Sequence, residues 1–332
     1  MAVKESMRSN LRVINGSANP ELSKEICELL KVQSSDIHIS KFADSETHVQ
    51  IEESLRGKDL YIIQPTCPPV NENLMELLIT IDACRRASAY QITAVVPYYG
   101  YARQDHKSTG REPITAKLVA DLIAASGASR VVTIDLHAAA IQGFFNIPVD
   151  HITAVPVLSN YFKKKEFKNA VIVSPDSGRV KLAEKYADIL QLPLVVMTKR
   201  RRGIGGKKLD LYNIVGDVKG KIAIVIDDII TSGSIVRQVE LLADAGVNEV
   251  YLSITHAILA PPAIERLQSP VIKELITTNT VPVPEDKRLN NKVKVLSVAP
   301  LLAEVILNIH QNKSVSQLLS RLILKQHLVF PV

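Results

Sequence analysis

Residues 224–234 read Ile-Val-Ile-Asp-Asp-Ile-Ile-Thr-Ser-Gly-Ser, and this stretch predicts the fold more clearly than any other part of the chain. The run Ile222–Ile226 is apolar at every position, which is typical of a parallel strand buried on both faces. Asp227 and Asp228 therefore stand at the carboxyl end of a buried strand, where open α/β sheets bind ligands. The loop that ends at Ser234 offers hydroxyls and backbone N–H groups ahead of an expected helix, which suits a phosphate.

The same order of strand and helix recurs along the chain. Strands are expected in several apolar runs, including Leu11–Ile14, Leu60–Gln64, Ile92–Pro97 and Ala170–Ser174. Amphipathic stretches lie between these runs, so the sequence predicts an α/β fold of two similar domains, each with a mainly parallel sheet flanked by helices. The predicted domains are residues 8–153 and 154–318, followed by a tail at 319–332, and the final helix is a candidate for packing back across the boundary.

Composition narrows the possible classes of protein. A length of 332 residues suits about two domains, and a net charge of +6 suits small anionic substrates as well as nucleic acid. The absence of Trp disfavours a stacking platform for single-stranded nucleic acid. Three cysteines without CxxC spacing disfavour disulfides and a zinc knuckle. Met1–Asn10 lacks an apolar core and no apolar run approaches ~20 residues, so we expect a soluble cytoplasmic protein without a membrane or nucleic-acid partner.

The 224–234 stretch also has a purely structural explanation. The acid pair could cap a strand, and residues 231–234 could be an ordinary N-cap loop. The combination of buried strand, acid pair and Thr/Gly loop favours a functional site over that explanation. No G-x-x-x-x-G-K-[ST] pattern occurs, which disfavours a P-loop NTPase.

The acid pair and its loop resemble the phosphoribosyl-pyrophosphate loop of the type I phosphoribosyltransferase fold. Longer motifs make the chain similar to class I ribose-phosphate pyrophosphokinases, and these are Gln64–Leu78, Pro97–Asp105, Arg111–Leu118, Asp135–Ala138 with Ile141–Phe145, and Ser174–Asp176. The resemblance runs from about residue 15 to about residue 318. It implies two phosphoribosyltransferase-type domains, and transfer of the diphosphoryl group of ATP to the 1-hydroxyl of ribose 5-phosphate, with Mg²⁺ as cofactor. It also suggests a homo-oligomer, a hexamer built from dimers.

The resemblance assigns roles to particular residues. The ribose 5-phosphate residues would be Asp227, Asp228, Thr231, Ser232, Gly233 and Ser234. The ATP residues would be Phe42, Asp44, Glu46, Arg103 and Gln104. His137 and Asp176 would form the metal site, with His137 also catalytic. Judged without the motif, His137 would be a satisfied structural histidine, and a surface ion pair would be as good an explanation of Arg103.

A basic run precedes a glycine-rich stretch. Lys199-Arg-Arg-Arg202 leads into Gly203-Ile-Gly-Gly206, which suggests a flap that closes on a charged transition state. The resemblance nominates Lys199 and Arg201 as catalytic. A nucleic-acid patch is the weaker alternative, because the run is short and has no aromatic residues interleaved with it.

The chain departs from the family pattern at four places. The sugar-phosphate loop is one residue shorter than Asp-Asp-x-x-Asp-Thr-Gly/Ala-Gly-Thr and lacks its third acid. Arg179 stands where Ser-Pro-Asp-x-Gly-Gly has its last glycine, Ala140 where a Gln is usual, and Ser45 where a Gly is usual. These changes leave two alternatives, a catalytically weak regulatory homologue and a phosphoribosyltransferase. Retention of His137, Lys199 and Arg201 favours the enzyme over the regulatory homologue, and the ATP-type motifs disfavour the phosphoribosyltransferase.

Overall fold

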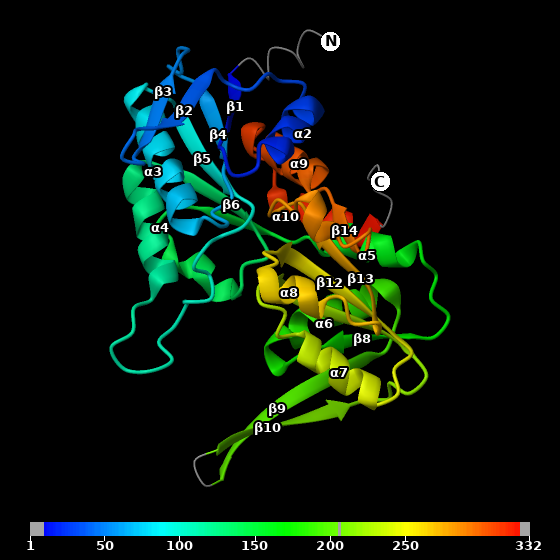
Figure 1. Cartoon of the computed structure of the whole chain (residues 1–332). Coiled ribbons are helices and arrows are strands. Elements are labelled where there is room, and N and C mark those ends of the chain that lie inside the picture. The colour runs from blue at the N-terminus through cyan, green and yellow to red at the C-terminus, as the bar shows by residue number, and fades with distance from the viewer. Residues whose placement is uncertain (1–9, 205–206, 326–332) are drawn as a thin grey trace. The chain divides into compact units, whose positions relative to one another are not determined.

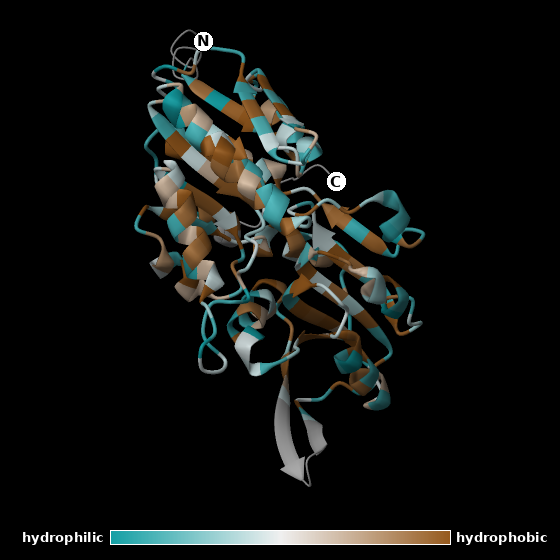
Figure 2. Cartoon of the chain, turned by 60° about the vertical axis from the view of Figure 1, so that its left-hand side comes forward, coloured by the Kyte–Doolittle hydropathy of each residue, from teal (hydrophilic) through white to brown (hydrophobic). Residues whose placement is uncertain are grey.

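The computed structural model describes residues 10–204 and 207–325, which form two compact units (Figure 1). The first unit contains the chain up to Thr153 together with Thr280–Pro282 and Ser297–Leu324. The second contains Ala154–Asn279 and Val283–Leu296. Each unit has its own sheet, and hydrophobic residues concentrate along the strands of both (Figure 2).

The first unit is built on a parallel sheet. Its strands, in spatial order, are β1 (Leu11–Asn15), β4 (Asp59–Ile63), β5 (Gln91–Val96), β6 (Arg130–Ile134) and β7 (Val149–Ile152). All neighbouring pairs are parallel, and every residue of β4 is buried, including Asp59 at its start. A separate antiparallel hairpin is formed by β2 (Ile37–Lys41) and β3 (Thr47–Ile51).

Helices cover the sheet of the first unit. On one side lie α3 (Val70–Arg86) and α4 (Thr115–Ser126), which pack against each other, with η1 (Ala139–Phe144) beside α4. On the other side lie α2 (Pro20–Leu30) and α9 (Ala299–His310), which also pack together (Figure 1). Helix α2 begins where sequence chemistry predicts, because Asn19 accepts a hydrogen bond from the Leu22 N–H and proline occupies the first helical position.

The last helices belong to the first unit, although the sequence predicted that residues up to 318 lie in the second domain. Both α9 and most of α10 (Val315–Lys325) group with the first unit. His310 of α9 holds this connection, since its Nδ1 lies 2.6 Å from Oδ2 of Asp59 at the start of β4. The Ser297 hydroxyl, just before α9, donates to the Glu25 carboxylate on α2. The chain therefore returns to its starting unit after building the second sheet.

The second unit has a larger sheet. Its spatial order is β10 (Lys207–Val215), β9 (Leu194–Ile204), β8 (Ala170–Ser174), β11 (Ile222–Ile230), β12 (Glu249–Ala257), β13 (Ile272–Thr278) and β14 (Val293–Leu296). All pairs are parallel except β9 with β10, which form a long antiparallel hairpin. The helices of this unit are α5 (Val155–Lys163), α6 (Val180–Leu190), α7 (Val236–Asp244) and α8 (Pro261–Arg266), with short 3₁₀ turns η2 (Ser177–Arg179) and η3 (Glu285–Arg288).

Candidate functional site

The chain order of the second sheet reverses between β8 and β11. From β8 the chain builds β9 and β10 on one side, and from β11 it builds β12 to β14 on the other. Such a reversal leaves a crevice beyond the carboxyl ends of the two strands, where open α/β sheets bind ligands. Val173 pairs with Val225, so the Ser-Pro-Asp motif, which begins at Ser174, and the acid pair lie at the same edge. The strand β11 continues past the acid pair to Ile230, beyond the end that the sequence predicted, and Asp227 pairs with Ile254 of β12.

An arginine joins the acid pair at this edge. The Asp228 N–H donates to Oδ1 of Asp227 at 2.8 Å, which sets the two carboxyls beside each other. From the end of β8, Arg179 reaches both acids: its Nε lies 3.0 Å from Oδ1 of Asp227, and its Nη2 lies 3.0 Å from Oδ1 of Asp228. Burial, and then the charge of Asp228, hold the pKa of the Asp227 carboxyl well above its usual value, while the Arg179 guanidinium opposes that shift.

Asp176 builds the turn from which Arg179 extends. Its Oδ1 accepts hydrogen bonds from the Gly178 N–H at 2.8 Å and from the Arg179 N–H at 3.1 Å. The buried Ser174 hydroxyl donates to the Asp176 carbonyl at 2.7 Å, which fixes the start of the turn. One carboxylate oxygen of Asp176 is therefore used in capping, as expected for an aspartate at an N-cap position.

The loop after β11 has the features of an anion site. Gly233 has a φ of +75°, and a Cβ there would lie 3.0 Å from Cα of Ala263, so this position needs glycine. Arg266 donates to the Ser232 carbonyl at 2.8 Å and steadies the loop. Within residues 10–204 and 207–325, the N–H groups of Ser232, Gly233 and Ser234 have no acceptor, and the buried Thr231 hydroxyl has no partner. These donors precede α7 and are available to a phosphate.

The predicted ATP residues of the first unit occupy two exposed segments. Arg103 follows β5, is exposed, and pairs with no carboxylate in the described part of the chain. Gln104 is tied to the start of α4, because its Oε1 accepts from the Thr115 hydroxyl at 2.6 Å and its carbonyl accepts from the Ala116 N–H at 3.1 Å. The loop is thus anchored through Gln104 and leaves the neighbouring guanidinium accessible to an anion.

Phe42, Asp44 and Glu46 lie in the turn of the β2–β3 hairpin. Phe42 is 54% exposed, and its ring centroid lies 5.0 Å from that of His48. The Phe42 N–H donates to the Glu46 carbonyl at 2.9 Å, and Oδ1 of Asp44 accepts from the Glu46 N–H at 3.2 Å. Ser45 adopts a φ of +75°, so the left-handed turn that the family's glycine would allow is formed here by a serine.

His137 and the basic run complete the predicted set. His137 follows β6 and is half-buried, next to Leu136, whose N–H donates to Nε2 of His151 at 2.9 Å. Lys199 and Arg201 lie on β9, where their backbones pair with those of Tyr212 and Asp210. Their side chains lie outside the described part of the structure. Within the described side chains, no three His, Cys, Asp or Glu residues gather in a metal-binding cluster.

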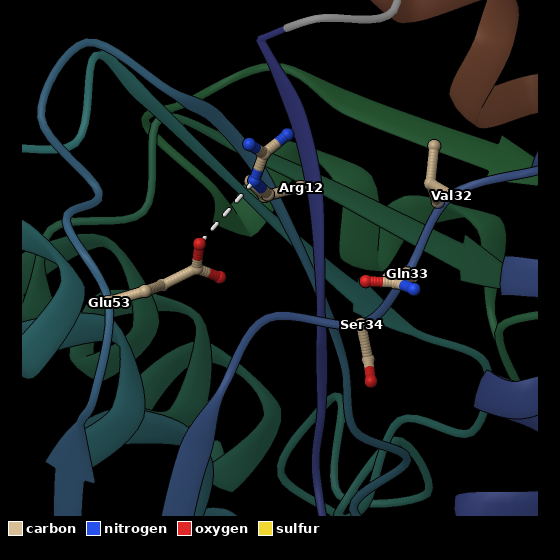
Figure 3. A pocket seen from close by; sticks show the side chains of 5 residues that line it. All are labelled: Arg12, Val32, Gln33, Ser34 and Glu53. Atoms are coloured by element: carbon tan, nitrogen blue, oxygen red, sulfur yellow. Dashed lines mark ion pairs between the residues drawn. The ribbon is translucent and has the colours of Figure 1, made fainter.

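A separate cavity of about 280 Å³ lies in the first unit (Figure 3). It is lined by Arg12, Val32, Gln33, Ser34 and Glu53, and Nε of Arg12 lies 3.7 Å from Oε2 of Glu53. Arg12 is the second residue of β1, so the cavity lies near the amino ends of the parallel strands. It does not contain the residues that sequence analysis selected.

The geometry defines a class of protein. The phosphoribosyltransferase type of α/β protein is characterised by an acid pair and an open phosphate-type loop at the switch point of a parallel sheet. This chain has both features, together with a second parallel sheet of its own. The predicted fold class is therefore confirmed. No helix in residues 10–204 and 207–325 has the length and apolar character needed to cross a bilayer.

Comparisons with known proteins identify the family. Residues 11–127 match the model of the N-terminal domain of ribose phosphate pyrophosphokinase, and residues 203–320 match the phosphoribosyl synthetase-associated domain. Ribose-phosphate pyrophosphokinases of Caldanaerobacter subterraneus and Bacillus subtilis are 53% and 50% identical, over 93% and 94% of this chain and 98% of each relative. The crystal structure of phosphoribosylpyrophosphate synthetase from Mycobacterium smegmatis matches with a TM-score of 0.86 and 44% identity, over 92% of this chain and 100% of that one.

The chain therefore belongs to the ribose-phosphate pyrophosphokinase family, which confirms the predicted family and its enzymatic class. Sequence analysis noted Arg179 only as a departure from the family pattern and did not predict its contact with the acid pair. The available signal was a cation three residues after the Ser-Pro-Asp motif that follows one apolar run, and two acids that follow another.

Proposed function

We propose that this enzyme transfers the β,γ-diphosphoryl group of ATP to the 1-hydroxyl of ribose 5-phosphate, giving phosphoribosyl pyrophosphate and AMP. The observation that carries the proposal is the switch-point site of the second unit. There, Asp227 and Asp228 lie beside a loop with three unsatisfied N–H groups and a buried, unpartnered hydroxyl. This arrangement offers carboxylates to sugar hydroxyls and donors to the 5-phosphate in a chain of this family.

Ribose 5-phosphate would bind through both parts of that site. The N–H groups of Ser232, Gly233 and Ser234 and the Thr231 hydroxyl would donate to the phosphate, which the positive end of α7 also favours. The carboxylates of Asp227 and Asp228 would accept hydrogen bonds from the sugar hydroxyls. The sugar would thus be held at both ends, which orients its 1-hydroxyl for attack.

ATP would bind through residues of the first unit. The exposed guanidinium of Arg103 would pair with phosphate oxygens, and Gln104 would hold the Arg103 loop against α4. The exposed ring of Phe42 would stack on the adenine, with Asp44 and Glu46 accepting hydrogen bonds from it. Phe42 would serve the active site of a neighbouring copy, so we propose a homo-oligomer, with a hexamer built from dimers as its form.

Mg²⁺ fits the donor set of the chain. Asp176 uses Oδ1 to cap its turn, which leaves Oδ2 as an oxygen donor, and His137 offers an imidazole. Mg²⁺ commonly takes one or two protein ligands, with substrate phosphates and waters as the rest, so the absence of a larger cluster among the described side chains suits it. When bound, the ion would neutralise charge on the phosphoryl oxygens. Asp176 and His137 would orient it.

Lys199 and Arg201 are the proposed transition-state residues. They occupy alternate positions of β9, so both positions lie on the same face of the β9–β10 hairpin. Cations held there would stabilise negative charge that develops during diphosphoryl transfer. We further propose a cytoplasmic location, since Cys27, Cys67 and Cys84 are all free and buried.

Formation of AMP from ATP tests this function. The purified protein should form AMP only when ribose 5-phosphate and Mg²⁺ are both present, with one phosphoribosyl pyrophosphate for each AMP. Release of ADP or inorganic phosphate instead would contradict the assignment. Binding of ATP without any AMP formation would favour the regulatory homologue.

A further inference from the structure

Arg179 gives the acid pair a feature that the family pattern does not contain. The pattern has a glycine at this position, whereas this chain has an arginine whose side chain is only 14% exposed. Its backbone has a φ of −99° and a ψ of 0°, a conformation that requires no glycine. The substitution therefore adds a cation to the crevice without imposing backbone strain.

The guanidinium lies between two carboxylates and contacts an oxygen of each. Nε and Nη2 each lie 3.0 Å from an Oδ1 atom, one on Asp227 and the other on Asp228. Both contacts are short ion pairs, and the contact with Oδ1 of Asp228 does not have the geometry of a hydrogen bond. The Asp227 side chain is 19% exposed, against 5% for Asp228. One cation thus offsets part of the charge of the acid pair, while part of Asp227 stays accessible.

We propose that Arg179 is a positioning residue for the sugar phosphate: it orients Asp227 and Asp228 and offsets part of their mutual repulsion, so that they accept hydrogen bonds from the sugar hydroxyls. This inference rests on the proposed function, because it requires the acid pair to bind the sugar. Arg179 acts through the two acids. The chain's own arginine supplies a compensating charge where the family pattern has only a glycine.

The physical reason is the proximity of two like charges in a buried place. Adjacent carboxylates with little solvent repel each other, and one of them then tends to keep a proton. A protonated carboxyl has one oxygen that donates, so it loses part of its capacity to accept from a hydroxyl. Asp228 and Arg179 are the charged groups that act on Asp227, and they shift its pKa in opposite directions. Removing Arg179 leaves only the unfavourable charge.

Kinetics of Arg179→Met and Arg179→Lys test the proposal. Methionine keeps much of the side-chain volume without charge, and lysine keeps the charge without the fork. For Arg179→Met we expect the KM for ribose 5-phosphate to rise roughly ten- to a hundredfold, with the KM for ATP nearly unchanged. The acidic limb of kcat/KM for ribose 5-phosphate should move to higher pH, because Asp227 then ionises less readily. Arg179→Lys should recover much of the lost affinity.

Arg130→Met is the matched control. Arg130 also forms a short, partly buried ion pair, with Nη1 at 2.6 Å from Oδ2 of Asp150, but it lies at the start of β6 in the first unit. Its loss should lower thermal stability without changing the KM for ribose 5-phosphate or the pH profile. A general effect of losing a buried arginine pair would appear in both variants.

Calorimetric titration with ribose 5-phosphate separates this inference from the proposed function. Weaker binding to Arg179→Met than to wild type supports the positioning role even if no AMP is formed. Equal binding, together with an unchanged pH profile, would overturn it while leaving the function intact, and tighter binding would show that Arg179 competes with the sugar. Absence of binding to the wild type would overturn both. If Arg179→Met fails to fold, Arg179→Gln, which also removes the charge, takes its place in the same two measurements.

Discussion

The acid pair of the second unit and the exposed ATP residues of the first unit are built in opposite ways. Asp227 and Asp228, in the buried strand β11, form ion pairs with Arg179. Phe42 and Arg103 lie on a hairpin turn and a loop, with Phe42 more than half exposed and Arg103 without an ion pair in the described chain. A small sugar phosphate can be held by a site that one unit completes by itself. The residues proposed to bind ATP present exposed side chains instead.

This difference predicts which substrate's affinity each region affects. Changes at the preorganised acid pair should act on sugar affinity and on stability together, because the same contacts serve both. Changes at the exposed residues should act on ATP affinity alone, since their side chains contribute little to the fold.

The largest expected effect is on the chemical step and concerns residues outside both binding regions. Lys199→Ala and Arg201→Ala should each lower kcat about 10²- to 10³-fold, because cations that stabilise a developing charge act mainly in the transition state. The KM values for both substrates should change much less. Steady-state kinetics of AMP formation measures this, with Lys219→Ala, an exposed lysine in the loop before β11, as the control. A variant with wild-type kcat would contradict the catalytic role and would favour the explanation that the basic run is an ordinary solvated part of the strand.

Asp228→Asn should weaken sugar binding next. The neutral amide accepts less strongly and leaves Arg179 with one carboxylate, so we expect the KM for ribose 5-phosphate to rise roughly ten- to a hundredfold. The KM for ATP should stay within about twofold, a difference of only ~0.4 kcal/mol. A larger effect on ATP than on the sugar phosphate would reverse the proposed division between the two regions.

Arg103→Ala should affect ATP alone. Loss of one charge-assisted contact to a phosphate predicts a rise of roughly tenfold in the KM for ATP, with ribose 5-phosphate affinity and thermal stability unchanged. Lys107→Ala, in the same loop and also exposed, is the control and should behave as the wild type. If both variants weaken ATP binding equally, the loop acts as a diffuse positive patch.

The smallest expected effect concerns stability and pH. Because the folded pKa of Asp227 is raised, its contribution to stability is present below the unfolded value of ~3.9 and is lost as pH rises through the folded value. Asp227→Asn removes this loss, so its free energy of unfolding relative to wild type should increase between pH 5 and pH 8. Each tenfold change in acid dissociation corresponds to about 1.4 kcal/mol. Urea unfolding at the two pH values measures the difference, and a constant difference would contradict this account of burial.

The sequence predicted the parts of the fold that local pattern determines. The apolar run before Asp227 gave β11, and the run Ile92–Pro97 gave β5 within one residue at either end. It did not predict β3, β7, β10 or β14, which are edge strands with several polar residues. The return of α9 to the first unit rests on His310 and Asp59, which are far apart in the sequence.

The candidate site divides in the same way. The acid pair and its loop could be found because they are contiguous and follow a recognisable strand. The Arg179 bridge could not, because it depends on β8 and β11 being neighbours in the sheet and on Asp176 shaping the turn between them. Ser45 kept the turn expected of a glycine, which the residue type alone would not indicate.

Transfer of isotopic label tests the central claim most directly. ATP labelled at the β-phosphate, incubated with the enzyme, ribose 5-phosphate and Mg²⁺, should give phosphoribosyl pyrophosphate that carries the label, with unlabelled AMP. The labelled product should disappear in Lys199→Ala and require a higher concentration of ribose 5-phosphate in Asp228→Asn. Label recovered in ADP or free pyrophosphate, with none on the sugar, would contradict the account.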